Sequence, residues 1–255
     1  MKKLISLFFV ASLFLIGFTA CEQQGEEPGI PGMGDTPGEL EIAETFTAPE
    51  GVIINLETLD EANIENALSS QNQLKSTEGF FFRRGCGGSQ WNGNFKVWIR
   101  VKLDVQNTSN QKWCFNIPAG TVFQVSDPSY QNGITISPIK ICVESKGFCN
   151  VELWLMCLNR GKDGSTANVT YKILGVTGNA RMWNLVRKLR YKRCNIEWYL
   201  NVDPSAKLKS ATAENIETYK ELADQIQNAI WQLTNDGEDL TEEQIKYFES
   251  LPDIE

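Results

Sequence analysis

The feature that most constrains the fold of this chain is a stretch in which apolar and polar side chains alternate. From Phe95 to Val105 every second residue is apolar, and the residues between them, up to Gln106, are polar except for Trp98. This period of two predicts a β-strand with one face turned toward a core. Shorter apolar segments with turn residues between them follow at 112–117, 121–125, 134–136, 139–143, 151–158 and 169–174. Together they predict an antiparallel sandwich.

The hydrophobic period changes to that of a helix after residue 180. Apolar residues within 182–189 lie on one face of a short helix, and those within 216–233 lie on one face of a longer helix. Thr241 and Gln244 have the spacing of a capping box, which predicts a final short helix. We therefore expect an α+β fold, an antiparallel β-sandwich with C-terminal helices packed on it.

The N-terminus has the pattern of an export signal. Two lysines follow Met1, Leu4 to Phe18 are almost all apolar, and two small residues precede Cys21. The apolar run is too short for a stable membrane span, so we interpret residues 1–20 as a secretory signal peptide. A cysteine directly after the small residues is typical of lipoprotein signals, in which its thiol receives a diacylglyceryl group. We predict that Cys21 is lipidated and anchors the mature chain to a membrane.

The remaining chain divides by composition into four parts. Residues 21–50 are rich in Gly, Pro and Glu and predict a disordered tether. Residues 51–92 form a partly helical segment, residues 93–205 the sandwich module with one inserted helix, and residues 206–255 a helical segment. The acidic stretch after Cys21 resembles the signal that sends Bacteroidota lipoproteins to the cell surface. The resemblance implies an outer-membrane lipoprotein, at the periplasmic face or the cell surface.

The charge of the chain argues against a nucleic-acid partner. Removal of residues 1–20 takes away two lysines and no acidic residue, so the formal net charge moves from -8 to -10. The basic run 187–193 is the one exception, and we interpret it as a solvated helix face.

Six further cysteines follow Cys21, and export to an oxidising compartment would let them form up to three disulfides. Cys149 and Cys157 cannot pair, because eight residues of one strand span roughly 26 Å. Cys142 and Cys149 flank the turn 144–148, so we predict a disulfide between them. The chain has no histidine and no Cys-x-x-Cys spacing, so we expect no metal and no cofactor.

The same lack of histidine removes the common nucleophile systems of hydrolases. Glycoside cleavage by a pair of carboxylates is still possible, because such pairs come from distant positions in a sequence.

Trp98 and Trp154 lie on the strand faces opposite the apolar alternation, where exposed aromatic rings could stack on sugars. The alternative, which we favour, is that a second layer covers both rings.

Two segments, Met156–Asn159 and Ile226–Trp231, together resemble bacterial thioester domains. The resemblance implies that the side chain of Gln227 is bonded to the sulfur of Cys157, shielded from water until a ligand amine attacks. This chain has Ile226 where those domains usually have threonine, and its two residues lie closer together in sequence. The alternative is that Cys157 is a disulfide or an inert core thiol and that the second segment is an amphipathic helix.

The sequence thus predicts a membrane-anchored extracytoplasmic module that binds a protein or a glycan without catalysis. A covalent adhesin with a Cys157–Gln227 thioester is the alternative, and a glycan-acting enzyme is a weaker one.

Overall fold

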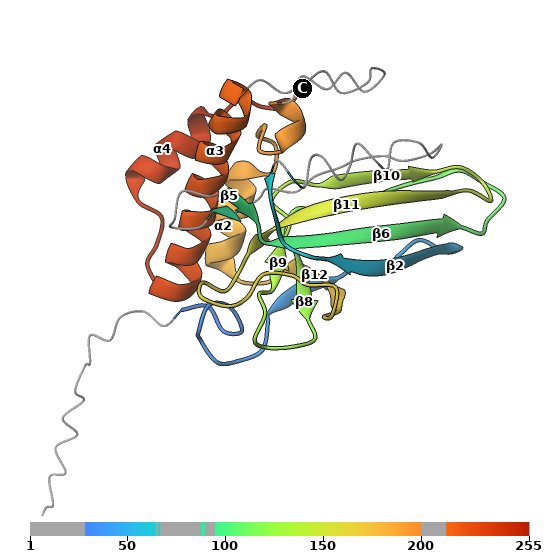
Figure 1. The fold of residues 1–255 in the computed structure, drawn as a ribbon, viewed down its shortest axis with the longest axis horizontal. Coiled ribbons are helices and arrows are strands. Elements are labelled where there is room, and N and C mark those ends of the chain that lie inside the picture. Colours follow the sequence, from blue (N-terminus) through green and yellow to red (C-terminus); the bar gives the residue numbers. More distant parts are fainter. Residues whose placement is uncertain (1–28, 65, 67–87, 90–94, 200–212, 255) are drawn as a thin grey trace, which may run out of the picture.

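The fold is given by a computed structural model that describes residues 29–64, 66, 88–89, 95–199 and 213–254. It is an α+β fold with the sandwich-like arrangement expected from the sequence. The largest sheet has seven strands in the order β1-β12-β8-β9-β11-β6-β2, and all of its paired strands are antiparallel. A β7–β10 ribbon and a small sheet of β3, β5 and β4 accompany it. Helices α2, α3 and α4 gather at one side of the molecule (Figure 1).

The bounds of the strands are β1 Ile42–Thr45, β2 Val52–Leu59, β3 Ala62–Asn63, β4 Gly88–Ser89, β5 Phe95–Val97, β6 Ile99–Asn107, β7 Trp113–Ile117, β8 Thr121–Val125, β9 Gly133–Ile134, β10 Ile139–Val143, β11 Phe148–Cys157 and β12 Tyr171–Thr177. The helices are α2 Ala180–Leu189, the short 3-10 helix Ile196–Trp198, α3 Ala213–Trp231 with a π-helical continuation Gln232–Asp236, and α4 Glu242–Ser250.

Strand β11 separates two hydrophobic cores, and both of its faces are buried along Val151–Cys157. Val151, Leu153, Leu155 and Cys157 face the sandwich core, which they share with apolar residues of β6, β7, β8 and β10. Trp154 and Met156 face the helix-side core, which contains the buried faces of α2 and α3 and Phe248 of α4. The sequence alternation within 151–157 therefore assigns these side chains to the correct faces.

The long alternating stretch forms two strands instead of one. β5 and β6 are separated at Trp98, and β5 pairs with β3 and β4 while β6 pairs with β11 and β2. The alternation itself is confirmed, because Val97, Ile99, Val101, Leu103 and Val105 are all buried. Each of the six shorter apolar segments contains or overlaps a strand, β7 to β12.

The three predicted helices are confirmed as α2, α3 and α4. Thr241 caps α4 with the expected capping box, since its hydroxyl accepts a hydrogen bond from Gln244 N and the Gln244 side chain accepts one from Thr241 N. The side chain of Asn179 caps α2 by accepting from the amides of Arg181 and Met182.

The prediction of a disordered tether over 21–50 is wrong for residues 29–50. Ile30 and Met33 are buried in the helix-side core, and β1 pairs with β12. The glycines that suggested disorder instead provide tight turns, with positive φ at Gly32, Gly34 and Gly38. Residues 21–28, including Cys21, lie outside the described part of the chain.

The prediction of a partly helical segment over 51–92 is only partly met, because Ile64 and Asn66 are helical while most other described residues of this segment lie in strands. Residues 52–59 form β2, an edge strand paired with β6 along its whole length. The apolar residues whose spacing suggested a helix are divided, since Leu59 and Ala62 lie in β2 and β3, Ile64 is helical, and Leu68 is outside the described residues.

The predicted Cys142–Cys149 disulfide is wrong, because Cys142 is bonded to Cys114. These two cysteines lie directly opposite each other on β10 and β7, with Cα atoms 4.1 Å apart. The turn 144–148 does join β10 to β11, but the two strands pair with different neighbours and form no hairpin. Cys149 and Cys157 are buried free thiols, Cys194 is buried as well, and Cys86 lies outside the described residues. No helix in the described ranges has the length and apolarity needed to cross a membrane.

Candidate functional site

The end of β11 is closed by a side chain from α3. β6 pairs with β11 only as far as Ile99 opposite Leu155, and the chain before Ile99 leaves for another sheet. The Cys157 main chain therefore lacks a strand neighbour on that edge. Gln227 takes its place: Cys157 N donates to Gln227 Oε1 at 2.9 Å, and Gln227 Nε2 donates to Cys157 O at 2.8 Å. Since Gln227 is only 1% exposed, these bonds replace water that cannot reach the strand end.

The structure thus brings together the two residues of the thioester resemblance, but through the main chain of Cys157. The Cys157 side chain lies in the sandwich core, whereas Ile226 and Ile230 beside Gln227 lie in the helix-side core. Trp231 does share the sandwich core with the thiol. Burial, reinforced by the carboxylate of Glu61, raises the pKa of the Cys157 thiol well above its ordinary value. A thiol that stays protonated is a poor nucleophile.

Asn159, two residues farther along, connects two distant segments. Asn132 N donates to Asn159 Oδ1 at 2.9 Å, and Asn159 Nδ2 donates to Gly34 O at 2.8 Å. Gly34 N in turn donates to Leu158 O at 2.8 Å. With Asn159 only 1% exposed, this side chain is a buried link between the N-terminal loop 29–38 and the segment after β8.

The loop 29–38 is held closely against the π-helical end of α3. Gly34 has φ +58, and a Cβ atom on it would collide with the carbonyl oxygen of Thr234. Only glycine allows both this backbone conformation and this close approach. Asn235 Nδ2 also donates to Asp35 Oδ2 at 3.2 Å, which fixes the Asp35 side chain.

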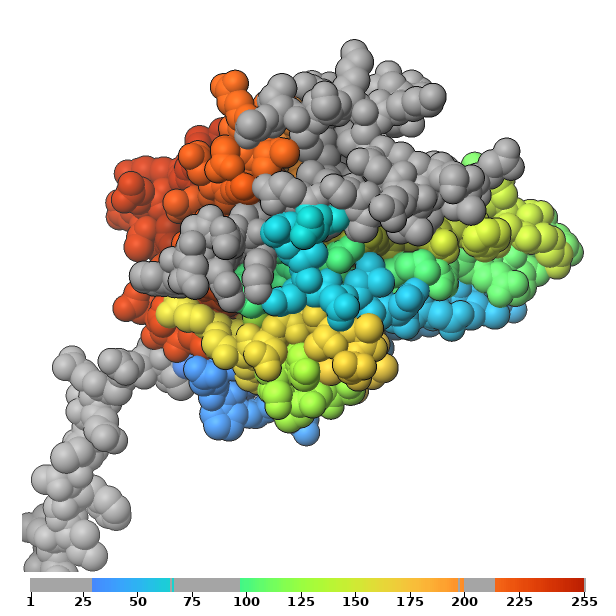
Figure 2. Space-filling view, in the orientation of Figure 1, coloured from blue at the N-terminus to red at the C-terminus, as the bar shows by residue number. Residues whose placement is uncertain are grey.

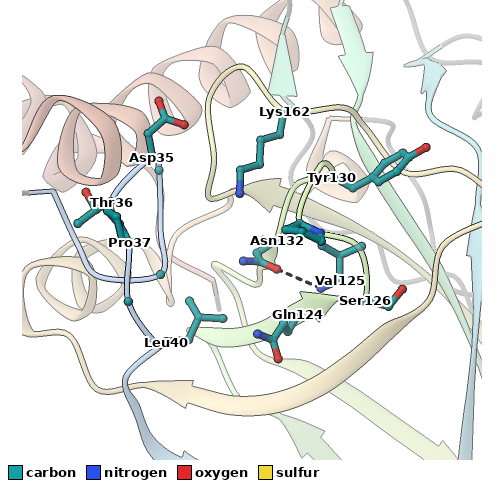
Figure 3. Close-up of a pocket in the computed structure, with 14 residues that line it drawn as sticks. Asp35, Thr36, Pro37, Leu40, Gln124, Val125, Ser126, Tyr130, Asn132 and Lys162 are labelled. Atoms are coloured by element: carbon teal, nitrogen blue, oxygen red, sulfur yellow. Dashed lines mark hydrogen bonds between the residues drawn. The ribbon is translucent and has the colours of Figure 1, made fainter.

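These segments enclose a cleft of about 450 Å³ between the N-terminal loop, the β8–β9 connection and the loop after β11 (Figure 3). Figure 2 shows the three parts of the chain beside one another at the lower edge of the molecule, in blue, green and yellow. The cleft is lined by Gly32, Gly34, Asp35, Thr36, Pro37, Gly38, Leu40, Gln124, Val125, Ser126, Pro128, Tyr130, Asn132 and Lys162. Backbone, amide and hydroxyl groups make up about half of the exposed walls, and apolar parts of Leu40, Val125, Tyr130 and two prolines make up the rest.

Lys162 extends its ammonium group into the cleft, between the 35–37 loop and Asn132 (Figure 3). Its own backbone is fixed, because Lys162 O accepts a hydrogen bond from Gln131 Nε2 at 2.9 Å. Neighbouring bonds also anchor the loop, with Asp163 N donating to Ser129 O and Gln131 N donating to Asp163 O. A firmly held loop therefore carries a charged group at the centre of the cleft.

The described walls of the cleft provide hydrogen-bond donors and acceptors but few carboxylates. Asp35 is the only carboxylate among its described lining residues, and Figure 3 shows it turned away from the centre. Glycoside hydrolysis usually needs two carboxylates on opposite sides of the bond that breaks. Within the ranges that the structure covers, no group of three or more His, Cys, Asp or Glu residues has a metal-binding arrangement.

The two tryptophans proposed as sugar platforms are not available for stacking. Trp154 is fully buried and Trp98 is 8% exposed, because a second layer covers both faces of the sheet. The indole of Trp154 donates to Glu152 Oε1 at 2.8 Å, and the same oxygen forms a buried ion pair with Arg100 at 2.9 Å. Their role is in the core, so the favoured expectation that both rings are covered is confirmed and the sugar-stacking alternative is wrong.

The cleft was not predicted from the sequence, because its walls come from three segments far apart in the chain. Ile30 and Met33, two apolar residues within a Gly- and Pro-rich stretch, were the signal that residues 29–40 belong to the fold.

Comparison with known proteins gave no match: no protein-family model, no curated protein and no solved structure is similar to this chain.

Replacement of Gln227 by methionine tests its role at the end of β11. Gln227→Met keeps the length of the side chain but leaves Cys157 N–H and C=O without partners, so we expect the free energy of unfolding to fall by about 2–5 kcal/mol. Chemical denaturation measures the change. Gln225→Met, on the exposed side of the same helix, is the matched control. Equal stability of the two variants would show that the hydrogen bonds are dispensable.

Replacement of Asn159 by alanine tests the link between the cleft walls. Without its amide, Gly34 O and Asn132 N lose their buried partners, so we expect faster hydrogen exchange in residues 32–38 and 130–134. Hydrogen exchange followed by mass spectrometry measures this. Asn168→Ala, at an exposed position in the following loop, should leave both segments unchanged. Unchanged exchange in Asn159→Ala would contradict the assigned link.

Proposed function

We propose that this protein is a membrane-anchored extracytoplasmic module that binds a polar segment of a protein or a glycan without changing it chemically. The observation that carries the proposal is a cleft whose walls are fixed by buried hydrogen bonds while the ammonium of Lys162 at its centre is left unused. Binding sites of this kind are preformed, so little ordering is required when a ligand enters.

The position of the cleft relative to Cys21 supports a ligand close to the membrane. Residue 29, where the described fold begins, follows Cys21 by eight positions, and the cleft wall begins at Gly32. Eight residues span at most about 28 Å, even when fully extended. A lipid on Cys21 would therefore hold the cleft within reach of the membrane surface and of molecules displayed there.

The covalent and enzymatic alternatives have less support. A thioester requires the Gln227 carboxamide carbon to bond to sulfur, whereas both polar atoms of this carboxamide are hydrogen-bonded to the Cys157 main chain. A glycan-acting enzyme would need a second carboxylate in the cleft, and the described lining provides only Asp35.

Filling the cleft tests the proposal. The mature chain without its lipid, residues 22–255, is screened against arrays of glycans and peptides, and binders are measured by calorimetry. Gln124→Trp places a large ring in the cleft at a strand position that accepts aromatic residues, so we expect it to abolish binding with little loss of stability.

Lys140→Trp, which adds the same ring at an exposed position on β10, should bind as the wild type does. If Gln124→Trp retains full affinity, the cleft is not the site. If no glycan or peptide binds the wild type, the proposed function loses its basis.

A further inference from the structure

We infer that the ligand of the cleft is an acidic glycan, bound through a sugar carboxylate by Lys162 and Asn132. This inference rests on the proposed function and specifies the ligand class of the same site. It is drawn from which lysines form ion pairs, the orientation of one amide and the composition of the walls.

Lys162 differs from every other half-buried lysine whose side chain the structure describes. The others each form an ion pair at 2.7–2.9 Å: Lys102 with Glu57, Lys188 with Glu249, Lys192 with Asp253, and Lys220 with Glu217. Within the described ranges, Lys162 Nζ has neither an ion pair nor a hydrogen bond, although acidic residues outnumber basic ones in the chain by 32 to 24. A carboxylate on the ligand would give it the kind of partner that its counterparts have.

Asn132 provides a second donor with a fixed direction. Val125 N donates to Asn132 Oδ1 at 3.0 Å, so the oxygen is committed to the strand and Nδ2 is turned toward the cleft (Figure 3). The Asn132 main chain is held as well, by its bond to Asn159. An ammonium and an amide N–H₂ directed into one space favour an acceptor with more than one oxygen, such as a carboxylate.

Asp35, the one acidic side chain among the described lining residues, does not oppose this assignment. Asp35 accepts a hydrogen bond from Asn235 and points away from Lys162 in Figure 3. A carboxylate ligand would therefore meet the ammonium without a second negative charge directed at it.

The walls favour a sugar over a peptide. A peptide is commonly bound by adding a strand to a free sheet edge or by placing side chains in apolar pockets. β8, the strand that forms the floor of the cleft, is paired with β12 on one side, and on the other side β9 pairs with Val122 and Phe123 and the Asn132 side chain accepts from Val125 N, so little of its edge is open to a peptide. The walls combine amides, hydroxyls and glycine backbone with small apolar surfaces from Leu40, Val125 and two prolines and with the Tyr130 ring, a mixture that suits the hydroxyl groups and C–H faces of a sugar.

A matched pair of ligands tests the inference with residues 22–255. Carboxylated oligosaccharides, among them oligogalacturonate and a glucuronate-containing oligosaccharide, are compared by calorimetry with their neutral methyl esters. We expect at least one acid to bind roughly tenfold or more tighter than its ester, the gain of one charge-assisted hydrogen bond. Lys162→Gln should remove this difference, Lys162→Arg should keep most of it, and Lys140→Gln should leave it unchanged.

The outcomes separate the inference from the proposed function. Equal binding of acids and esters in the cleft, unaffected by Lys162→Gln, would overturn the inference and leave the binding module intact. Binding of peptides alone, blocked by Gln124→Trp, would do the same. Failure of every glycan and peptide to bind would overturn both.

Discussion

The structure depends on the hydrogen bonds by which Gln227 pairs with the last residue of β11, Cys157. This strand divides the sandwich core from the helix-side core, and β6 does not extend far enough to pair with its last residue. A main-chain amide and carbonyl left unpaired inside the protein would cost about 1–3 kcal/mol each. Gln227 supplies a carboxamide in place of the missing peptide group, so α3 is attached to the sheet by hydrogen bonds as well as by apolar packing.

Four consecutive residues at this strand end connect the core to the candidate site. Met156 and Leu158 pack in the helix-side core and Cys157 in the sandwich core, which fixes the direction of the chain. Asn159 then joins the N-terminal loop to the segment after β8. The walls of the cleft are therefore only as rigid as the strand end that precedes them. Lys162 and its anchored loop follow within a few residues. The Lys162 ammonium, which forms no ion pair with the described residues, is therefore held in place by the same strand end.

Local patterns in the sequence were sufficient to predict the strands after residue 95, helices α2 to α4 and the α+β class, but not β1 to β4. The alternation over 95–106 and the capping box at Thr241 report on neighbouring residues, which is why they were interpretable. The predictions of a tether over 29–50 and of a Cys142–Cys149 disulfide were wrong because each depends on which distant segment lies alongside. Cys142 faces Cys114 only because β10 pairs with β7, and Ile30 and Met33 are buried only because the helices provide a core. Prediction of the cleft would have required three such distant contacts at once.

The proximity of Cys157 and Gln227 was predicted from a family resemblance, but the two residues are joined by hydrogen bonds to the Cys157 main chain and not by the thioester that the resemblance implies.

The most direct test of this account is the covalent state of Cys157 and Gln227. The mature chain is purified from an oxidising compartment without reducing agent, and its intact mass and peptide map are recorded before and after methylamine. Because burial raises the pKa of Cys157 and the Gln227 carboxamide is hydrogen-bonded to the main chain, we expect both residues unmodified, a disulfide between Cys114 and Cys142, and no change with methylamine. A cross-linked Cys157–Gln227 peptide, lighter by one ammonia and cleaved by methylamine, would contradict the account and identify a covalent adhesin.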